Sequence, residues 1–322
     1  MNRRAAKKVV SLLPAATEML YALGAEDSLV GISHECDFPE RLPDLPRLTR
    51  SRLDVDGLSG RIHESMLELV ENALSIYEVD VTRLRALDPD IIITQDLCDV
   101  CAVSYDDVCA ALRDITGSRA RIIRLHPERL EDIYDDLHRI GDALDRGEQA
   151  ANLIVTLKAR MTHLRDTARR LPSRSVLLVE WLQPVMIGGL WSADLAAAVG
   201  ARVLASEPGA HARTLGMDEL AELDPDVVVI KPCGFDLARV LEEVPRFGDY
   251  FPWTQWRAVD EDRVFIVDGN AYFNRPGPRI VDSAEILAAC MYHEEFSGYR
   301  RQYAEGVRRV HSDLSVGEFY VD

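Results

Sequence analysis

The sequence predicts an α/β protein built from two similar lobes, and a repeated segment is the main observation behind this prediction. Residues 87–93 read LDPDIII and residues 223–229 read LDPDVVV, so in both places a polar helix end runs into a short apolar strand. A repeat of about 136 residues is too long for a solenoid and suits two lobes. Two open α/β lobes that face each other form a cleft, and small ligands bind in such clefts.

The elements of the first lobe follow from short apolar runs, which predict strands, and from 3.6-residue periodicity, which predicts helices. Pro14 precedes the first helix, and Gly24 suits its C-terminal end. Strands are expected near 8–13, 28–32, 91–94 and 121–125, and helices at 15–24, 64–77, 81–87 and 103–116.

The middle of the chain is helical in pattern from residue 128 to about 171, with one weak point at 145–147. Residues 147–171 contain no proline and predict a helix about 37 Å long at about 1.5 Å per residue, which could act as a strut between the lobes. The second lobe is then expected to have strands near 175–180, 185–188, 201–204, 227–230 and 264–267, and helices near 193–199, 217–222, 236–243 and 278–292. These elements predict an N-terminal lobe over 1–128, a helical connector over 129–172, a C-terminal lobe over 173–293 and an unassigned tail over 294–322.

Composition excludes several classes of protein. The net charge is −17, from 37 basic and 54 acidic residues, which argues against a nucleic-acid partner. No apolar run reaches the roughly 18 residues of a membrane span. Six cysteines are too few for a disulfide scaffold. The basic segment 1–8 is followed by an apolar stretch too short for a secretion signal, so we expect a cytoplasmic protein, or a periplasmic or cell-surface one if a leader has been removed.

Several segments resemble one known family. Residues 11–18 (SLLPAATE), 24–25 and 30–33 are similar to the opening of the cobalamin- and siderophore-binding proteins of ABC importers, and the two LDPD strands and residues 274–280 (NRPGPRI) fit the same pattern. The resemblance covers about residues 8–292 and is closest to the cobalamin-binding branch. It implies two Rossmann-like lobes joined by a rigid helix, a ligand held between them and little hinge motion.

The resemblance also implies a permease partner, which such proteins contact through one acidic residue on each lobe. The second lobe offers Asp218 or Glu219 at this position, whereas the first lobe has Thr82. Thr82 and the missing leader are departures from the family pattern, and they concern transport rather than ligand binding.

Candidate ligand-binding residues lie where strands end, because the loops at the carboxyl ends of parallel strands hold the ligands of open α/β sheets. Trp181, Trp191 and Tyr272 would suit a wide, flat corrin ring, a porphyrin or a catecholate equally well. Alternatively, these aromatic residues cover the cores of their own lobes. The candidates are Pro14, Ala15, Thr17, Ser33, His34, Phe38, Gln95, Trp181, Trp191, Lys231, Tyr272, Phe273 and Arg275.

A second group of candidates is rich in thiols. If the strands before them are neighbours, Cys98 and Cys101 would meet His34 and Cys36 at one wall of the cleft. Such soft ligands suit zinc or iron, and a CxxC pair can also be a redox dithiol or only a structural loop. His34 alone could offer its imidazole to the cobalt of a corrinoid.

Phosphate-loop, dinucleotide, nucleophile-elbow and HExxH motifs do not occur in the sequence. The leading interpretation is therefore a non-catalytic binder of a corrinoid, or of another large metallo-ligand such as a haem or siderophore. The alternative is a cytoplasmic metalloprotein or redox enzyme that uses Cys98 and Cys101 on the same scaffold. A third interpretation is an importer component whose leader is missing from the sequence.

Overall fold

The computed structural model describes residues 7–53, 57–71, 77–95 and 120–320. The chain forms two compact units, which are described separately. The first comprises Met1–Gly57, Arg61–Pro127 and Glu131–Thr156, and the second comprises Leu58–Gly60, Glu128–Leu130 and Leu157–Asp322. Among the described residues, no helix is both long and apolar enough to cross a membrane.

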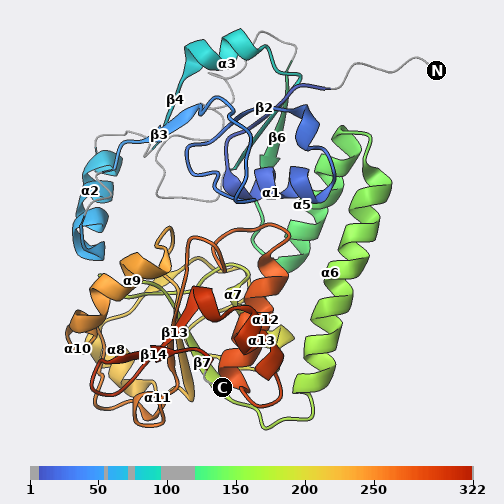
Figure 1. The fold of residues 1–322 in the computed structure, drawn as a ribbon. Coiled ribbons are helices and arrows are strands. Elements are labelled where there is room, and N and C mark those ends of the chain that lie inside the picture. Colours follow the sequence, from blue (N-terminus) through green and yellow to red (C-terminus); the bar gives the residue numbers. More distant parts are fainter. Residues whose placement is uncertain (1–6, 54–56, 72–76, 96–119, 321–322) are drawn as a thin grey trace. The chain divides into compact units, whose positions relative to one another are not determined.

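The first unit is built on a parallel sheet in the order β2-β1-β5-β6 (Figure 1). Its strands are β1 (Val9–Ser11), β2 (Leu29–Ile32), β5 (Ile91–Gln95) and β6 (Arg121–Leu125), all at the predicted places. The helices are α1 (Pro14–Ala22), the short 3₁₀ helix η1 (Glu26–Ser28), α3 (Val81–Leu87) and α5 (Leu130–Ala143). The residues Val10, Leu48, Leu84 and Ile92 form a buried cluster that packs α3 against the sheet.

The long connection between β2 and α3 differs from the prediction. It contains a small hairpin of β3 (Thr49–Ser51) and β4 (Tyr77–Val79), and the helix α2 (Ser59–Glu71). The predicted helix 64–77 is therefore wrong at its end, because Tyr77 begins a strand that pairs with β3. Strands of three residues are too short to show a period of two in the sequence.

The middle of the chain forms two helices, as predicted. α5 ends before Asp145, which adopts a left-handed conformation (φ 58°), and α6 (Gly147–Ala168) follows. Gly141 allows the two helices to approach closely, because a Cβ there would lie 2.6 Å from the Cβ of Ala150. The junction between the two units falls inside α6, after Thr156.

The second unit has a larger, mixed sheet in the order β10-β8-β7-β11-β12-β13-β14, with β9 also paired to β7. Its parallel centre is β7 (Ser175–Trp181), β11 (Val227–Ile230) and β12 (Val264–Val267), and its other strands are β8 (Met186–Ile187), β9 (Arg202–Val203), β10 (Arg213–Thr214), β13 (Val307–Val310) and β14 (Val316–Glu318). The helices are α7 (Ser192–Ala198), α8 (Met217–Glu222), α9 (Leu237–Glu243), η3 (Val244–Arg246), α10 (Phe247–Tyr250), α11 (Arg257–Asp260), α12 (Ile280–Met291), α13 (Ser297–Gln302) and η4 (Ala304–Gly306).

The repeated LDPD segments have the same structural role in both units. Each leads into the central strand that pairs with the first strand of its sheet, β5 with β1 and β11 with β7. In the first unit, Asp90 Oδ2 accepts a hydrogen bond of 2.8 Å from the backbone N–H of Lys8. In the second, Asp226 Oδ2 accepts one of 2.7 Å from the N–H of Ser175. The second aspartate of each repeat thus binds the start of the neighbouring strand.

The C-terminal residues, to which no element was assigned from the sequence, complete the second unit. β13 pairs antiparallel with β12, and β14 pairs with β13. Tyr303 donates a hydrogen bond of 2.5 Å to Glu285 on α12, and Arg160 on α6 forms an ion pair with the same carboxylate at 2.7 Å. Glu285 is only 3% exposed, and these two partners satisfy its buried charge.

Candidate functional site

The carboxyl ends of β1 and β2 in the first unit hold most of its predicted ligand residues. Thr17 and Cys36 are buried there, with Thr17 Oγ1 2.9 Å from Ser11 Oγ and 3.1 Å from Cys36 Sγ. Ala15 is also buried, whereas Pro14, at the start of α1, is partly exposed. These contacts give Ala15 and Thr17 a packing role behind the strand ends.

His34 lies in the loop after β2 and is partly buried. Its Nδ1 is 2.7 Å from the hydroxyl of Thr49, and its ring is 5.8 Å from the ring of Tyr77. The hydroxyl of Ser33, which is buried, is 2.8 Å from that of Thr49. Two further predicted residues of this unit, Phe38 and Gln95, are exposed.

The predicted convergence of His34, Cys36, Cys98 and Cys101 required β2 and β5 to be neighbours. They are not, because β1 lies between them in the sheet. Cys36 is 1% exposed and contacts Thr17, and Cys98 and Cys101 lie outside the described residues. Within the described part of the chain, no group of three His, Cys, Asp or Glu side chains could hold a metal ion. The structure thus gives no support for zinc or iron at Cys36, and it does not describe the CxxC pair.

The second unit brings three strand ends together around one buried amine. Lys231, directly after β11, is 1% exposed, and its Nζ donates to Glu180 Oε2 at 3.1 Å and to Asn274 Oδ1 at 3.0 Å. Glu180 belongs to β7, and Asn274 lies in the loop after β12. The amide of Asn274 donates in turn to the backbone oxygens of Lys231 and Gly269, both at 2.9 Å. The buried amine of Lys231 therefore links the ends of β7 and β11 to the loop after β12.

The predicted aromatic residues of this unit fall into two groups. Trp191 and Phe273 are 6% and 1% exposed, and the indole N–H of Trp191 donates to the carbonyl of Phe273 at 2.7 Å. Both belong to the core, and for Trp191 this agrees with the alternative interpretation. Trp181 at the end of β7 is partly exposed, and the ring of Phe235 meets it edge-on at 5.3 Å.

Tyr272 and Arg275 lie in the loop after β12. Tyr272 is partly exposed and packs edge-on against Tyr303 at 5.9 Å, and burial raises the pKa of its hydroxyl. Arg275 is 8% exposed and donates to Asn270 Oδ1 at 2.8 Å. Asp268 accepts the backbone N–H groups of Asn270 and Ala271, and burial nevertheless raises its pKa. This loop is thus held by its own polar side chains.

Residues 9–271 match the family described as periplasmic binding protein. The chain belongs to that family. The predicted resemblance and the two-lobed α/β fold of a substrate-binding protein are therefore confirmed.

Individual relatives of this periplasmic binding protein are distant in sequence. A vitamin B12-binding protein of Yersinia pestis (strain Pestoides F) is 22% identical over 290 residues, which cover 89% of this chain and 87% of that protein. The uncharacterized ABC transporter substrate-binding lipoprotein YvrC of Bacillus subtilis (strain 168) is 20% identical over 297 residues, or 90% and 81% of the two chains. The crystal structure of a periplasmic heme binding protein from Pseudomonas aeruginosa has a TM-score of 0.65 at 21% identity, covering 98% of each chain.

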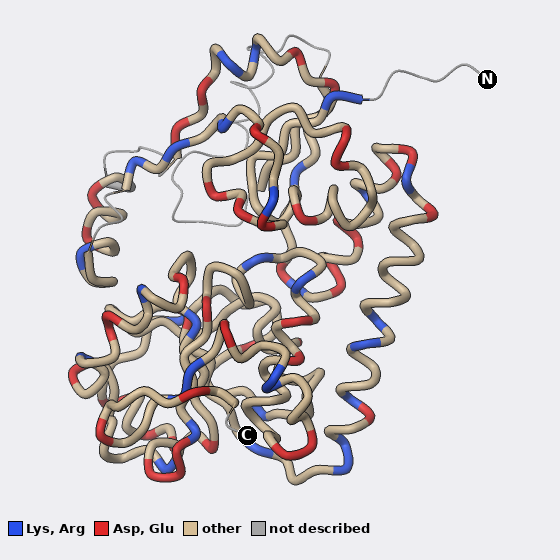
Figure 2. The backbone as a smooth tube through the Cα atoms, viewed as in Figure 1, with Lys and Arg blue, Asp and Glu red and all other residues tan. Residues whose placement is uncertain are grey.

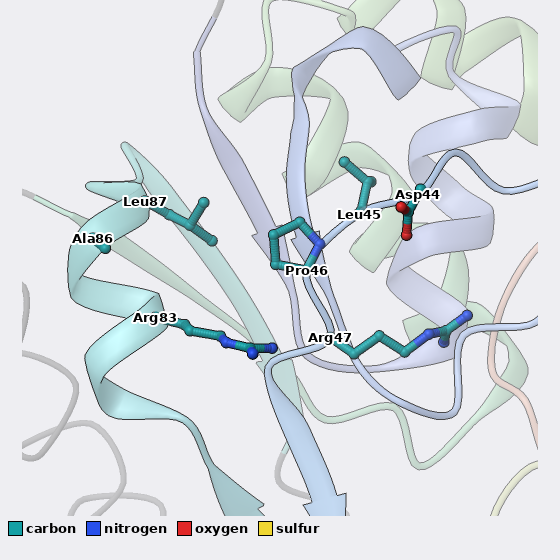
Figure 3. A pocket seen from close by; sticks show the side chains of 7 residues that line it. All are labelled: Asp44, Leu45, Pro46, Arg47, Arg83, Ala86 and Leu87. Carbon is teal, nitrogen blue, oxygen red and sulfur yellow. The ribbon is translucent and has the colours of Figure 1, made fainter.

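A hollow of about 570 Å³ lies on the first unit of this binding protein, between α3 and the segment before β3 (Figure 3). Figure 3 shows the side chain of Arg83 extending from α3 toward Pro46, whereas the guanidinium of Arg47 points away from Arg83. A second hollow of about 580 Å³ shares both arginines and includes Thr82. None of the predicted ligand residues lines either hollow. The first is lined by Asp44, Leu45, Pro46, Arg47, Arg83, Ala86 and Leu87.

Sequence reasoning missed three residues that shape the two groups of strand ends. Tyr77 was placed in a helix, yet it contacts the ring of His34 and donates to Glu35 Oε1 at 3.0 Å. Asn274 was noted only as part of a motif, yet it binds Lys231. Thr49 was not among the predicted candidates, yet its hydroxyl lies 2.7 Å from His34 Nδ1. The sequence contains no local signal for these contacts, because each joins segments more than ten residues apart.

Proposed function

We propose that this periplasmic binding protein binds a corrinoid of the cobalamin type, or a similar large metallo-ligand such as haem, for an ABC importer. The observation that carries the proposal is the partly exposed indole of Trp181 at the carboxyl end of β7. Phe235 supports it edge-on, and the Arg239 guanidinium lies 4.4 Å from the centre of the Phe235 ring. A fixed aromatic face beside polar loops suits a flat, mostly apolar ring with amide arms.

The names of two relatives support the same class of ligand. Vitamin B12 and haem are both planar macrocycles with a metal at the centre, and these are the ligands named for the Yersinia protein and the Pseudomonas protein. A preformed aromatic site lowers the ordering cost of binding such a ligand.

Burial divides the predicted ligand residues into two roles. We assign direct contact to those whose side chains are partly or fully exposed, and support of the strand ends to those that are buried. The contact residues are Pro14, His34, Phe38, Gln95, Trp181 and Tyr272, and the supporting residues are Ala15, Thr17, Ser33, Trp191, Lys231, Phe273 and Arg275.

Titration with hydroxocobalamin, cobinamide and haemin tests the proposal, with calorimetry as the readout. We expect saturable binding, and at least about 10-fold weaker binding in Trp181→Ala, since loss of a central aromatic anchor costs about 2 kcal/mol. Trp253→Phe is the matched control, because Trp253 is 6% exposed and its indole N–H binds the carbonyl of Ser312 instead. If none of the three ligands binds, the proposal is wrong.

The permease contact is proposed for α8 in the second unit. Asp218 and Glu219 are both exposed in its first turn, but Glu219 already accepts the backbone N–H of Gly216 at 3.0 Å and pairs with Arg213 at 2.9 Å. Asp218 is therefore the acid that we assign to a basic partner. In the first unit, α3 carries Thr82 and two arginines, Arg83 and Arg85. Figure 2 shows basic positions in blue along this helix. The two helices thus offer different charges to a partner.

Uptake of labelled cobalamin by host cells that depend on this protein tests the role of Asp218. Asp218→Lys should abolish uptake and leave ligand affinity unchanged, whereas Glu222→Lys at the end of the same helix should keep uptake. Normal uptake with Asp218→Lys would refute the assignment. An importer component works outside the cytoplasm, so we also propose a periplasmic or cell-surface location. Recovery of the native protein from the cytoplasmic fraction alone would contradict it.

A further inference from the structure

We infer that His34 Nε2 coordinates the metal at the centre of the bound macrocycle and that Thr49 positions the imidazole for this contact. The inference rests on the proposed function, because it requires a ligand whose metal has an exchangeable axial position. Beyond the proposed function, it assigns the metal contact to Nε2 of His34 and the orientation of the imidazole to the hydroxyl of Thr49.

The backbone fixes Thr49 beside His34. The segment before β3 pairs with the end of β2, with Ile32 N–H donating to Pro46 O at 3.0 Å and Leu48 N–H donating to Ile32 O at 2.8 Å. Thr49 follows Leu48 directly, so its hydroxyl lies next to the residues that follow β2. The same hydroxyl accepts the backbone N–H of His34 at 3.0 Å. This pairing sets the position of the hydroxyl independently of the imidazole.

Arg47 holds the loop after β2 from its other side. One guanidinium nitrogen, Nη1, lies within hydrogen-bond distance of the backbone oxygens of Ser33 (3.1 Å), His34 (3.0 Å) and Cys36 (2.8 Å). The loop is thus tied both through its carbonyls and through the His34 side chain. A metal ligand needs this kind of support, because outer contacts orient the ring.

The hydrogen bonds of the Thr49 hydroxyl are compatible with the metal-binding form of the imidazole. That form carries its proton on Nδ1 and leaves the lone pair of Nε2 free. Thr49 then accepts two hydrogen bonds, from the N–H and the Nδ1–H of His34, and donates its own proton to Ser33 Oγ, 2.8 Å away. A hydroxyl has two acceptor sites and one donor, so this arrangement uses its capacity in full.

The other nitrogen of the ring is available. His34 Nε2 has no hydrogen-bond partner among the described residues. The side chain is bound by Thr49 through Nδ1, and its ring lies 5.8 Å from the ring of Tyr77. Tyr77 is held in turn by Glu35 at 3.0 Å. One imidazole is too few for a bare zinc ion, which takes four ligands. It is enough for a metal whose four equatorial positions are filled by a macrocycle, as in haem proteins with a proximal histidine.

On binding, the imidazole nitrogen would take the place of a water molecule on the metal. Nδ1 keeps its proton, which stays hydrogen-bonded to Thr49 Oγ1, and the metal would keep its oxidation state, so no further reactant is needed. The ring therefore binds by simple ligand exchange.

The probes for the experiment are hydroxocobinamide, which lacks the nucleotide base and has exchangeable axial positions, and haemin. Absorbance reports coordination, and tryptophan fluorescence reports binding. All four tryptophans, at positions 181, 191, 253 and 256, belong to the second unit, so a change at His34 or Thr49 leaves the fluorophores in place. The variants are His34→Ala, Thr49→Val and Thr49→Ser. His138→Ala, on the exposed face of α5, is the control.

With the wild type and the control, we expect binding and a spectrum typical of an imidazole-ligated metal. His34→Ala should still quench fluorescence but lose this spectrum, and added imidazole should restore it. Thr49→Val should weaken coordination by about 10- to 100-fold, the usual effect of removing an outer partner of a metal ligand, and Thr49→Ser should restore it.

Two results would overturn the inference, and they are distinguishable. If the bound spectrum is the same in His34→Ala and the wild type, another group binds the metal, although quenching would still support the proposed function. If no probe quenches fluorescence or changes in absorbance, the proposed function fails as well. Circular dichroism of each variant checks that it is folded.

Discussion

Replacing Lys231 by methionine should destabilise the second unit without a direct loss of ligand contact. Methionine keeps an unbranched apolar side chain in a site where Lys231 is 1% exposed. It removes the amine that lies 3.1 Å from Glu180 Oε2 and 3.0 Å from Asn274 Oδ1. The perturbation therefore cuts the link between the ends of β7, β11 and the loop after β12.

The two lost contacts differ in cost. Glu180 is 25% exposed on its side chain and keeps the N–H of Gly189 at 3.2 Å, so water can replace the amine and the ion pair adds little. The amide oxygen of Asn274 loses a partner inside the loop, which costs about 1–3 kcal/mol. We expect a decrease of about 2 kcal/mol in the free energy of unfolding. This is less than the roughly 3–5 kcal/mol for breaking a fully buried pair.

Urea unfolding followed by tryptophan fluorescence measures this change, because all four tryptophans lie in the second unit. Lys158→Met on the exposed side of α6 is the control and should change stability by no more than about 0.5 kcal/mol. A Lys231→Met variant as stable as the wild type would refute the argument. If that variant were stable and also bound ligand more weakly, Lys231 would contact the ligand itself.

Three further predictions concern stability. Burial raises the pKa of Asp136 to about 6, above its unfolded value of 3.8 and against the effect of Arg139. The folded state therefore binds more protons than the unfolded state between these values, and stability falls as pH rises from about 4 to about 6. Asp136→Asn should remove this loss and raise the stability at pH 7 by up to about 3 kcal/mol. Thermal unfolding at about pH 4 and at pH 7, followed by circular dichroism, measures both effects. Gly141→Ala should cost about 1–3 kcal/mol, because its Cβ would lie 2.6 Å from that of Ala150, and an unchanged melting temperature would show that α5 and α6 separate freely. Asp226→Ala should lower the free energy of unfolding by about 1–3 kcal/mol, because the buried N–H of Ser175 loses its partner. Urea unfolding followed by tryptophan fluorescence measures this change, and an unchanged midpoint would contradict it.

The sequence determined the framework of this protein. The repeated LDPD segments predicted two equivalent central strands, and Asp90 and Asp226 bind the start of the neighbouring strand in the same way in both units. Local signals predicted the strands near 91–94 and 227–230 and the break between α5 and α6, because apolar runs, periodicity and glycine act over a few neighbouring residues. The family could be predicted for the same reason, because its short motifs occur in a characteristic order in the sequence.

Tertiary structure decided which side chains are accessible and which strands are neighbours. β1 separates β2 from β5, and no local pattern in the sequence could show that these two strands are not neighbours. Trp181 and Trp191 have equal apolar character in sequence, yet only Trp191 is buried, against Phe273. The partners of His34 and Lys231 come from distant segments, Thr49 and Asn274. The Lys231 pairing arises because β7, β11 and β12 end at the same edge of one sheet, and the His34 pairing arises because the segment before β3 pairs with the end of β2. Both depend on how separate segments are arranged in the folded chain.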